Sequence, residues 1–256
     1  MVSAPLRGSG WGLPEASPNP PSAVVIGASG GIGRALVAGL VGRGTYGSVF
    51  ALSRSGTVEA GPVAVGPIDL TDEASVRIAA ERVGRHGPVG LVVVAAGLLH
   101  GSGVAPEKAI RTLDPAAMAA VFAVNAIGPA LAAKHFLPLM PRAGRSVFAA
   151  LSARVGSISD NRLGGWYAYR ASKAALNQIL RTLAIEARRT HPDAIVAGLH
   201  PGTVTTALSE PFRPDPNTPG LFTPETSAAH LLRVIEGLGP EDTGGVFAWD
   251  GRRVPA

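Results

Sequence analysis

Short runs of apolar residues recur along the chain and stop at glycines or at polar residues. Apolar runs without polar alternation are typical of strands that are buried on both faces of a parallel sheet. The pattern predicts strands at residues 23–26, 48–52, 63–65, 91–95, 146–151, 195–199 and 246–249.

Longer segments between these runs carry apolar residues at the three- and four-residue spacing of a helix face. The first of these helices follows the glycines after residue 26. Further helices are predicted at residues 71–85, with Thr71 as the N-cap, and at 115–137, 167–188 and 224–237.

Strands that alternate with helices form βαβ units, which build a mostly parallel sheet covered by helices on both faces. No break in composition divides the chain after residue 22. We therefore predict an α/β fold: a Rossmann-type, doubly wound parallel sheet in a single domain at residues 23–256. Irregular segments at 98–114, 153–166 and 209–223 follow predicted strands, so they are expected to border one ligand crevice.

Residues 1–22 are rich in Pro, Gly and Ser and lack the apolar core of a secretory signal. We expect a disordered tail there, and a cytoplasmic protein. We expect no apolar segment long enough to span a bilayer, so no membrane partner is predicted.

Composition excludes several classes of protein. The chain has no cysteine, which rules out disulfides, thiol catalysis and Cys-ligated metals, and its six histidines are dispersed, so no metal site is predicted. The net charge is +5, but the basic residues are scattered and aromatic residues make up only 5% of the chain. Nucleic acid is therefore not an expected partner.

A glycine-rich turn joins the first predicted strand to the first helix. Glycines let the backbone turn tightly and let a pyrophosphate approach the helix N-terminus, where free N–H groups attract negative charge. The alternative is a glycine turn without a ligand, but the position between strand and helix favours a dinucleotide. The residues expected to hold it are Gly27, Ser29, Gly30, Gly31, Ile32 and Gly33.

The end of the second strand bears on the choice of cofactor. An acidic residue there favours NAD, whereas a basic residue accommodates the 2′-phosphate of NADP. Here the strand ends in Ser53 and Arg54, with no acid. Arg54 can pair with a phosphate and Ser53 can donate to it, so NADP(H) is the predicted cofactor. The alternative is that Arg54 is a solvent-facing loop residue.

Tyr169 and Lys173 are four residues apart at the start of a long predicted helix, and so lie on one face of it. A phenol has a reference pKa near 10, and a nearby ammonium lowers that pKa. The pair suits protonation of a carbonyl oxygen during hydride delivery, with Lys173 also able to donate to a cofactor ribose. The alternative is a pair without a catalytic role, since Tyr and Lys at this spacing are common on helix surfaces.

In combination these motifs resemble the short-chain dehydrogenase/reductase family. The glycine turn, Asp69-Leu70-Thr71, Asn125, Tyr169 with Lys173, and Pro201-Gly202 follow in the family's order and approximate spacing. The resemblance covers residues 23–250, and three stretches look like the C-factor-like branch, named for a bacterial signalling protein. These stretches are GSISDNRLGGWYAYRASKAALNQ, LHPGTVTT and FAWDG.

The resemblance implies further roles. Asp69 would contact the adenine, and Asn125 would hold a water that relays protons to Lys173; the alternative for Asn125 is a capped helix kink. A homodimer or homotetramer would form on the two long Ala-rich helices. The other positions implied to contact the cofactor are Leu70, Ala95, Ala96, Gly97, Pro201, Gly202, Thr203, Val204 and Thr206.

The chain departs from the family pattern at three places. Ile26 replaces the usual Thr before the first glycine, and Ala95 replaces an Asn after the fourth strand. The usual Ser-Ser pair reads Ser152-Ala153. Either Ser152 or Ser157 can supply the catalytic hydroxyl, or neither does. We favour Ser157, because its separation from Tyr169 along the sequence is close to the one usual in the family. A loop can also present its hydroxyl to the site.

Three functions remain open. The first is an NADPH-dependent carbonyl reductase, or the reverse alcohol dehydrogenase, acting on a small-molecule substrate with Tyr169 as general acid/base. The second is a cofactor-binding signalling or regulatory protein with weak or vestigial catalysis. A binder of nucleic acid or of a membrane surface is the least favoured. Retention of Asn125, Tyr169 and Lys173 together favours the enzyme.

Overall fold

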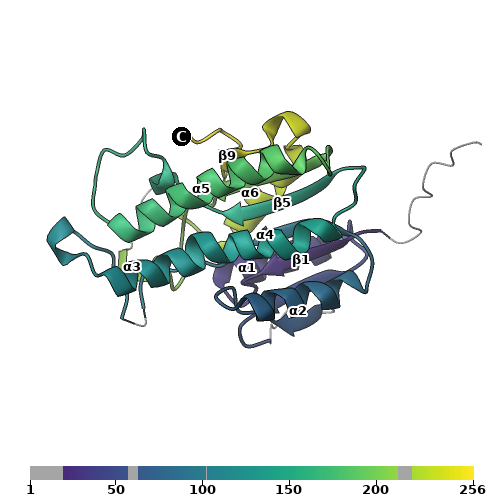
Figure 1. Ribbon diagram of the computed structural model, residues 1–256, viewed down its shortest axis with the longest axis horizontal. Coiled ribbons are helices and arrows are strands. Elements are labelled where there is room, and N and C mark those ends of the chain that lie inside the picture. Colours follow the sequence, from purple (N-terminus) through teal and green to yellow (C-terminus); the bar gives the residue numbers. More distant parts are fainter. Residues whose placement is uncertain (1–19, 57–62, 102, 213–220) are drawn as a thin grey trace, which may run out of the picture.

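A seven-stranded parallel sheet runs through the computed structural model, which describes residues 20–56, 63–101, 103–212 and 221–256 (Figure 1). The strand order is β3-β2-β1-β4-β5-β6-β9. The strands are β1 (Ser22–Ile26), β2 (Val49–Ser53), β3 (Ala64–Pro67), β4 (Val89–Val94), β5 (Ser146–Leu151), β6 (Ala194–His200) and β9 (Gly245–Ala248).

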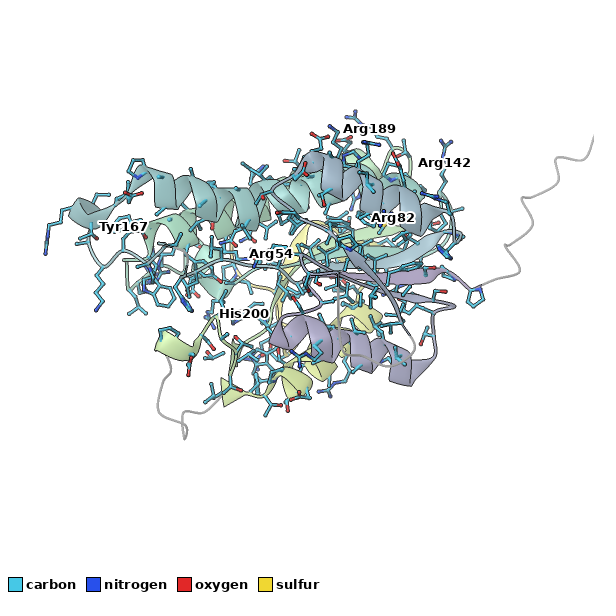
Figure 2. The ribbon with its side chains drawn as sticks, turned by 90° about the horizontal axis from the view of Figure 1, so that it is seen from below. Arg54, Arg82, Arg142, Tyr167, Arg189 and His200 are labelled. Carbon is cyan, nitrogen blue, oxygen red and sulfur yellow. The ribbon has the colours of Figure 1, made fainter. Side chains whose placement is uncertain are left out.

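Helices cover both faces of this sheet, and the three layers are seen edge-on in Figure 2. Helices α1 (Gly31–Arg43) and α6 (Pro224–Gly237) pack together on one face. Helices α2 (Glu73–Gly84), α4 (Gly128–Phe136) and α5 (Tyr167–Ala187) cover the other. The doubly wound α/β fold predicted from the sequence is confirmed.

Burial on both faces explains why the strands read as continuous apolar runs. In β1, Val24 and Ile26 belong to the core beneath α2, α4 and α5, whereas Ala23 and Val25 belong to the core beneath α1 and α6. Each fully buried Val, Leu or Ile side chain contributes about 1.5–3 kcal/mol to folding. Alternate residues of each central strand therefore stabilise two separate helix layers.

Several predicted boundaries were wrong. Helix α2 begins at Glu73, and its N-cap is Asp72, whose side chain accepts a hydrogen bond from the N–H of Ala74. Thr71 is not the cap, because it lies two residues before the helix; its N–H and hydroxyl donate to Asp69 instead. Ser22, expected in the tail, is a buried residue of β1.

The remaining tail prediction, at residues 1–19, lies outside the described residues. The short strands β7 (Thr203–Val204) and β8 (Leu221–Phe222) pair with each other, and neither was predicted. Residues 213–220, part of a segment expected to border the crevice, also lie outside the described part of the chain.

The helix predicted at 115–137 is continuous but irregular. It comprises α3 (Pro115–Phe122), a π-helical turn at Ala123–Ile127, α4 and a 3-10 turn at Leu137–Leu139. By length and composition Pro115–Leu139 is apolar enough to cross a membrane, which the sequence analysis did not expect. Here α3 and the π turn pack against α5, and the exposed Lys134 of α4 pairs with Glu73 of α2, so this helix belongs to one of the two helix layers of the α/β fold.

Candidate functional site

The glycine turn lies against the loop that follows β4. Gly27 has φ +87°, and a β-carbon added there would lie 2.7 Å from the backbone nitrogen of Ala96. A β-carbon on Gly33 would collide with the carbonyl oxygen of Gly27. Only glycine therefore permits both the turn and the close approach of α1 to it. The structure thus brings the glycine turn beside Ala95 and Ala96.

The N-terminus of α1 is open to an anion. Its N-cap is Gly30, which has no side chain to bind the first N–H groups, and the first turn of α1 holds no acidic residue. The methyl group of Thr206 would lie 3.0 Å from a β-carbon on Gly31, so the segment after β6 borders the same turn. Helix N-termini of this kind bind phosphate groups, and the residues present fit the pyrophosphate of a dinucleotide.

The ends of β2 and β3 place Arg54 near Asp69. Arg54 is exposed, near the middle of the molecule in Figure 2. Hydrogen bonds from Thr71 lower the pKa of the Asp69 carboxyl, and the charge of Arg54 lowers it further. Ser53 is buried, with its hydroxyl 3.2 Å from that of Ser55, and Leu70 is buried beside Asp69. A basic and an acidic side chain thus lie close together after the ends of β2 and β3.

Lys173 is buried, and it lies on the same face of α5 as Tyr169, as their spacing predicts. Its ammonium donates to the carbonyl oxygen of Leu151 at 2.7 Å and lies 5.8 Å from the centre of the Tyr169 ring. Burial lowers the pKa of Lys173 to about 8 and raises the pKa of Tyr169 to about 12. Without a ligand, the phenol is therefore protonated at neutral pH and ready to donate.

Asn125 lies in the π-helical turn and is fully buried. Its side chain accepts from the N–H of Leu98 and donates to the carbonyl oxygen of Leu98, both at 2.8 Å, and also donates to the hydroxyl of Ser172 at 3.1 Å. Asn125 therefore fixes the loop after β4 to α5. A β-carbon on Gly97 would lie 3.7 Å from the Asn125 oxygen and 3.9 Å from the Lys173 nitrogen. The implied water relay stays a prediction.

The two candidate serines are both buried, and their hydroxyls have other partners. Ser152 donates to the side chain of Asn177 on α5 at 2.6 Å. Ser157 donates to the backbone oxygen of Ala256 at 3.3 Å and accepts from the N–H of Asp160. The backbone of Ser152 continues the β5–β6 pairing, so its side chain is turned toward α5 by strand alternation.

The segment after β6 carries features that sequence reasoning missed. Gly202 lies against Phe222 and Trp249, whose rings are 4.7 Å apart, and the hydroxyl of Ser227 holds the carbonyl oxygen of Pro201. Burial lowers the pKa of His200 to about 4, so its ring is neutral at physiological pH. No spacing rule connects these aromatic residues, because they come from three separate elements. The rings of Phe222 and Trp249 and the hydroxyl of Ser227 thus hold Pro201 and Gly202 in place.

Glu107 was also missed, because a lone glutamate in a loop carries no motif. It is buried, and its carboxylate accepts from the N–H of Ala168 at 3.2 Å. Its backbone oxygen accepts from the N–H of Trp166 at 2.5 Å. Trp166 is the N-cap of α5 and has φ +53°, with no side-chain cap of its own. Glu107 thus supplies the missing cap to the helix that carries Tyr169.

The chain is similar to several known proteins. The short chain dehydrogenase family matches residues 21–217. C-signal of Myxococcus xanthus is 38% identical over 170 residues, covering 66% of this chain and 93% of that protein. The 1-hydroxy-2-glutathionyl-2-methyl-3-butene dehydrogenase of Rhodococcus sp. (strain AD45) is 30% identical over 222 residues, 86% of this chain and 93% of that protein. NADPH-bound carbonyl reductase from chicken fatty liver has a TM-score of 0.81 and 25% identity, over 93% of this chain and 95% of that one.

Proposed function

The chain belongs to the short-chain dehydrogenase family, in its C-factor-like branch, and we propose that it transfers a hydride between NADP(H) and a carbonyl or alcohol substrate. The observation that carries this proposal is the buried ammonium of Lys173 directly beneath the Tyr169 ring, in a site bordered by the glycine turn. Similarity to an NADPH-bound carbonyl reductase supports it.

The roles in carbonyl reduction follow from these positions. A nicotinamide bound beside Tyr169 and Lys173 would supply the hydride for the carbonyl carbon. Tyr169 donates its phenolic proton to the carbonyl oxygen, and the Lys173 ammonium stabilises the phenolate that is left. Asn125 holds the Leu98 loop and Ser172 in place beside this pair. Oxidation of the alcohol uses the same groups in reverse.

Two measurements test this function. NADPH consumption is followed with a panel of aldehydes and ketones, and NADP⁺ reduction with the matching alcohols. Turnover of any pair supports the oxidoreductase. Tight NADPH binding with no turnover over the whole panel favours the second candidate below.

Cofactor selection depends on Arg54 in this proposal. We expect NADPH to bind at least ~10-fold more tightly than NADH, the ratio that about 1.4 kcal/mol provides, because a guanidinium pairs strongly with a phosphate. In Arg54→Ala the preference disappears while NADH affinity stays the same. Fluorescence titration with both nucleotides measures this, with Arg189→Ala, at an exposed arginine after α5, as a control that should keep the preference for NADPH. Equal affinities in the wild type would contradict the assignment.

For the serines, we propose that Ser157 rather than Ser152 donates to the substrate oxygen. Ser152 is held by Asn177, whereas the hydrogen bond from Ser157 to Ala256 is long, at 3.3 Å, and is easily exchanged. We expect Ser157→Ala to lose ~10²-fold in turnover, as for one oxyanion donor, and Ser152→Ala to lose little. The reverse ranking in a steady-state assay would assign the role to Ser152. No loss in either variant would indicate a site that works without a serine.

A second candidate is a cofactor-binding signalling or regulatory protein with weak catalysis. Ala153 occupies the usual serine position, and the similarity to C-signal points in the same direction. Intact NADPH binding in a catalytically silent protein distinguishes this candidate from the reductase.

We propose a cytoplasmic homo-oligomer built on the α3–α4 helix and α5. Ile127 and Ile185 on these helices are both more than half exposed, which is typical of surfaces that are covered in an assembly. We expect a dimer or tetramer in light scattering at micromolar concentration. A monomer at that concentration would contradict this assembly.

A further inference from the structure

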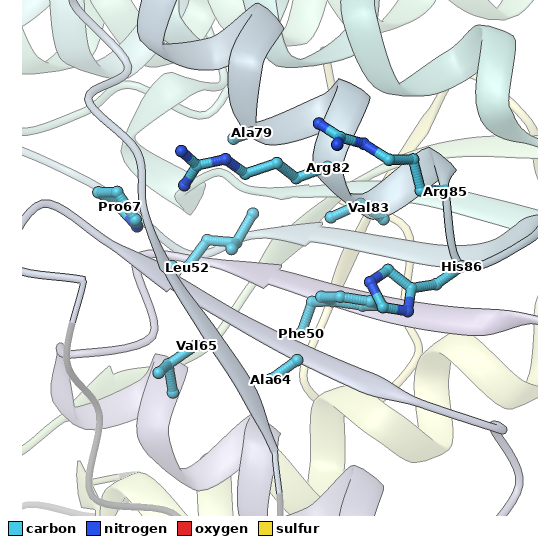
Figure 3. Close-up of a pocket in the computed structure, with 11 residues that line it drawn as sticks. Phe50, Leu52, Ala64, Val65, Pro67, Ala79, Arg82, Val83, Arg85 and His86 are labelled. Atoms are coloured by element: carbon cyan, nitrogen blue, oxygen red, sulfur yellow. The ribbon is translucent and has the colours of Figure 1, made fainter.

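A groove lies between the edge strand β3 and helix α2, with a volume of about 290 Å³ (Figure 3). Residues paired directly in parallel strands point to the same face, so Ala64 and Gly66 of β3 face α2 beside Phe50 and Leu52 of β2. Small residues at both inward positions of β3 leave the space that larger side chains would fill. The floor of the groove is therefore apolar and open.

Basic side chains border this apolar floor. Arg82 and Arg85 extend from α2 along one side, with Pro67 at one end and His86 at the other (Figure 3). All three basic groups are exposed. Among the described residues that line the groove, none is acidic. The groove therefore combines positive charge with apolar surface.

The neighbouring acid on α2 does not neutralise this charge. Glu81 is held by Arg77 at 2.6 Å, one turn away along α2. No residue of the groove belongs to the candidate active site, although Leu52 directly precedes Ser53. A ligand in the groove would therefore leave Tyr169 and Lys173 accessible.

We propose that this groove binds a small amphipathic carboxylate, with its chain over Phe50 and Leu52 and its carboxylate on Arg82 and Arg85. Guanidinium groups pair with carboxylates in a fixed, bidentate geometry, and the chain gains from burial of its apolar surface. The volume is at the lower end of the range for small-molecule pockets, which suits a chain of medium length.

Calorimetric titration of the full chain saturated with NADPH tests this proposal, with octanoate as the probe. We expect octanoate to bind, and acetate and 1-octanol to bind at least ~10-fold more weakly, because each lacks the chain or the charge. Arg82→Gln weakens octanoate binding at least ~10-fold, and Ala64→Leu abolishes it by filling the groove. Arg189→Gln, a matched loss of charge at an exposed arginine after α5, leaves it unchanged.

Thermal unfolding verifies that each variant is folded, and Arg82→Gln, at an exposed position, provides the test if Ala64→Leu is unstable. Three results would overturn the proposal: no octanoate binding, equal affinity for 1-octanol, or octanoate affinity that is the same in Arg82→Gln as in the wild type.

A different observation carries a second inference, which rests on the proposed function: Glu107 is a positioning residue for Tyr169. Tyr169 is the third residue of α5, so the place of its ring depends on how the first turn of that helix is fixed. Trp166 has the left-handed backbone conformation and provides no side-chain cap. We infer that the Glu107 carboxylate fixes this turn through the N–H of Ala168.

Asp114 offers a matched control, because it caps α3 by accepting from the N–H of Ala117 at 2.7 Å and does not contact α5 through that bond. We expect Glu107→Ala to lower kcat ~10-fold with KM for NADPH unchanged, and Glu107→Gln, which keeps an acceptor oxygen, to retain most of the activity. Asp114→Ala lowers the melting temperature but keeps kcat.

Hydrogen exchange of the peptide containing residues 166–173 gives a measure independent of activity. It becomes faster in Glu107→Ala and not in Asp114→Ala. Unchanged exchange in Glu107→Ala overturns the inference, whether or not a substrate has been found. If the wild type shows no turnover but hydrogen exchange is faster in Glu107→Ala, the result contradicts the proposed function. The positioning role of Glu107 would then still stand.

Discussion

Tyr169→Phe is expected to lower turnover by at least ~10²-fold, the lower range for a lost general acid. The substitution keeps the ring of Tyr169, a residue that lines a small cavity together with Leu99, Val104 and Ala168, and removes only the hydroxyl that carries the proton. Because burial raises the pKa of Tyr169 to about 12, this proton is present throughout the neutral range in the free protein. NADPH affinity should change little, since the glycine turn and Arg54 are untouched.

Steady-state kinetics with the best substrate of the panel, together with a nucleotide titration, measures both effects. Tyr167→Phe is the matched control, because Tyr167 is an exposed tyrosine two residues earlier on the same helix. It should behave as the wild type. Near-normal turnover in Tyr169→Phe would mean that another group supplies the proton, or that the signalling reading is correct.

Lys173→Met is expected to lower turnover by at least ~10²-fold, as for loss of a preorganised charge in a desolvated site. The variant keeps a buried, unbranched side chain but loses the ammonium and its hydrogen bond to Leu151. It should also weaken NADPH binding, because Lys173 is expected to donate to the ribose. Lys173→Arg keeps a charge but not the compact shape, so it should recover only part of the activity.

The pH profile gives the second signature of Lys173. Because burial lowers its pKa to about 8, the ammonium is lost as pH rises through that value, and kcat/KM for carbonyl reduction should fall above it. Lys173→Arg, which stays charged, should show no such fall near pH 8. A wild-type profile that stays flat from pH 7 to about pH 9.5 would contradict the assignment.

The lowered pKa of Lys173 also makes the free energy of unfolding depend on pH. Between about 8 and its ordinary value of 10.5, Lys173 is protonated in the unfolded chain and largely neutral in the folded one. The unfolded state then binds more protons, so the free energy of unfolding contributed by Lys173 rises with pH across this window. Below about pH 8 both states are protonated and this contribution is constant. Denaturant titrations of wild type and Lys173→Met at pH 7 and about pH 9.5 separate the contribution of Lys173 from the contributions of other titrating groups.

Local sequence patterns were sufficient to predict the fold, because each pattern follows from a physical constraint on residues that are close in the sequence. Continuous apolar runs mark strands buried on both faces, and the glycines at 27 and 33 mark a turn with no room for a β-carbon. The pair Tyr169 and Lys173 could be placed on one helix face because helical spacing is fixed by the backbone. These features predicted the parallel sheet, its helix layers and the family, and the structure and the comparisons confirm them.

Only the tertiary structure decided which partners each side chain meets. Asp72 rather than Thr71 caps α2, because the helix begins at Glu73, and Thr71 donates to Asp69 instead. Ser152 is turned to Asn177, and Glu107 caps a helix that begins sixty residues later, through contacts that no local pattern encodes. The groove beside β3 arises because Ala64 and Gly66 pair with larger residues of β2 beneath α2. Local periodicity determines which face a residue occupies, but long-range packing and competition for hydrogen bonds determine what it touches there.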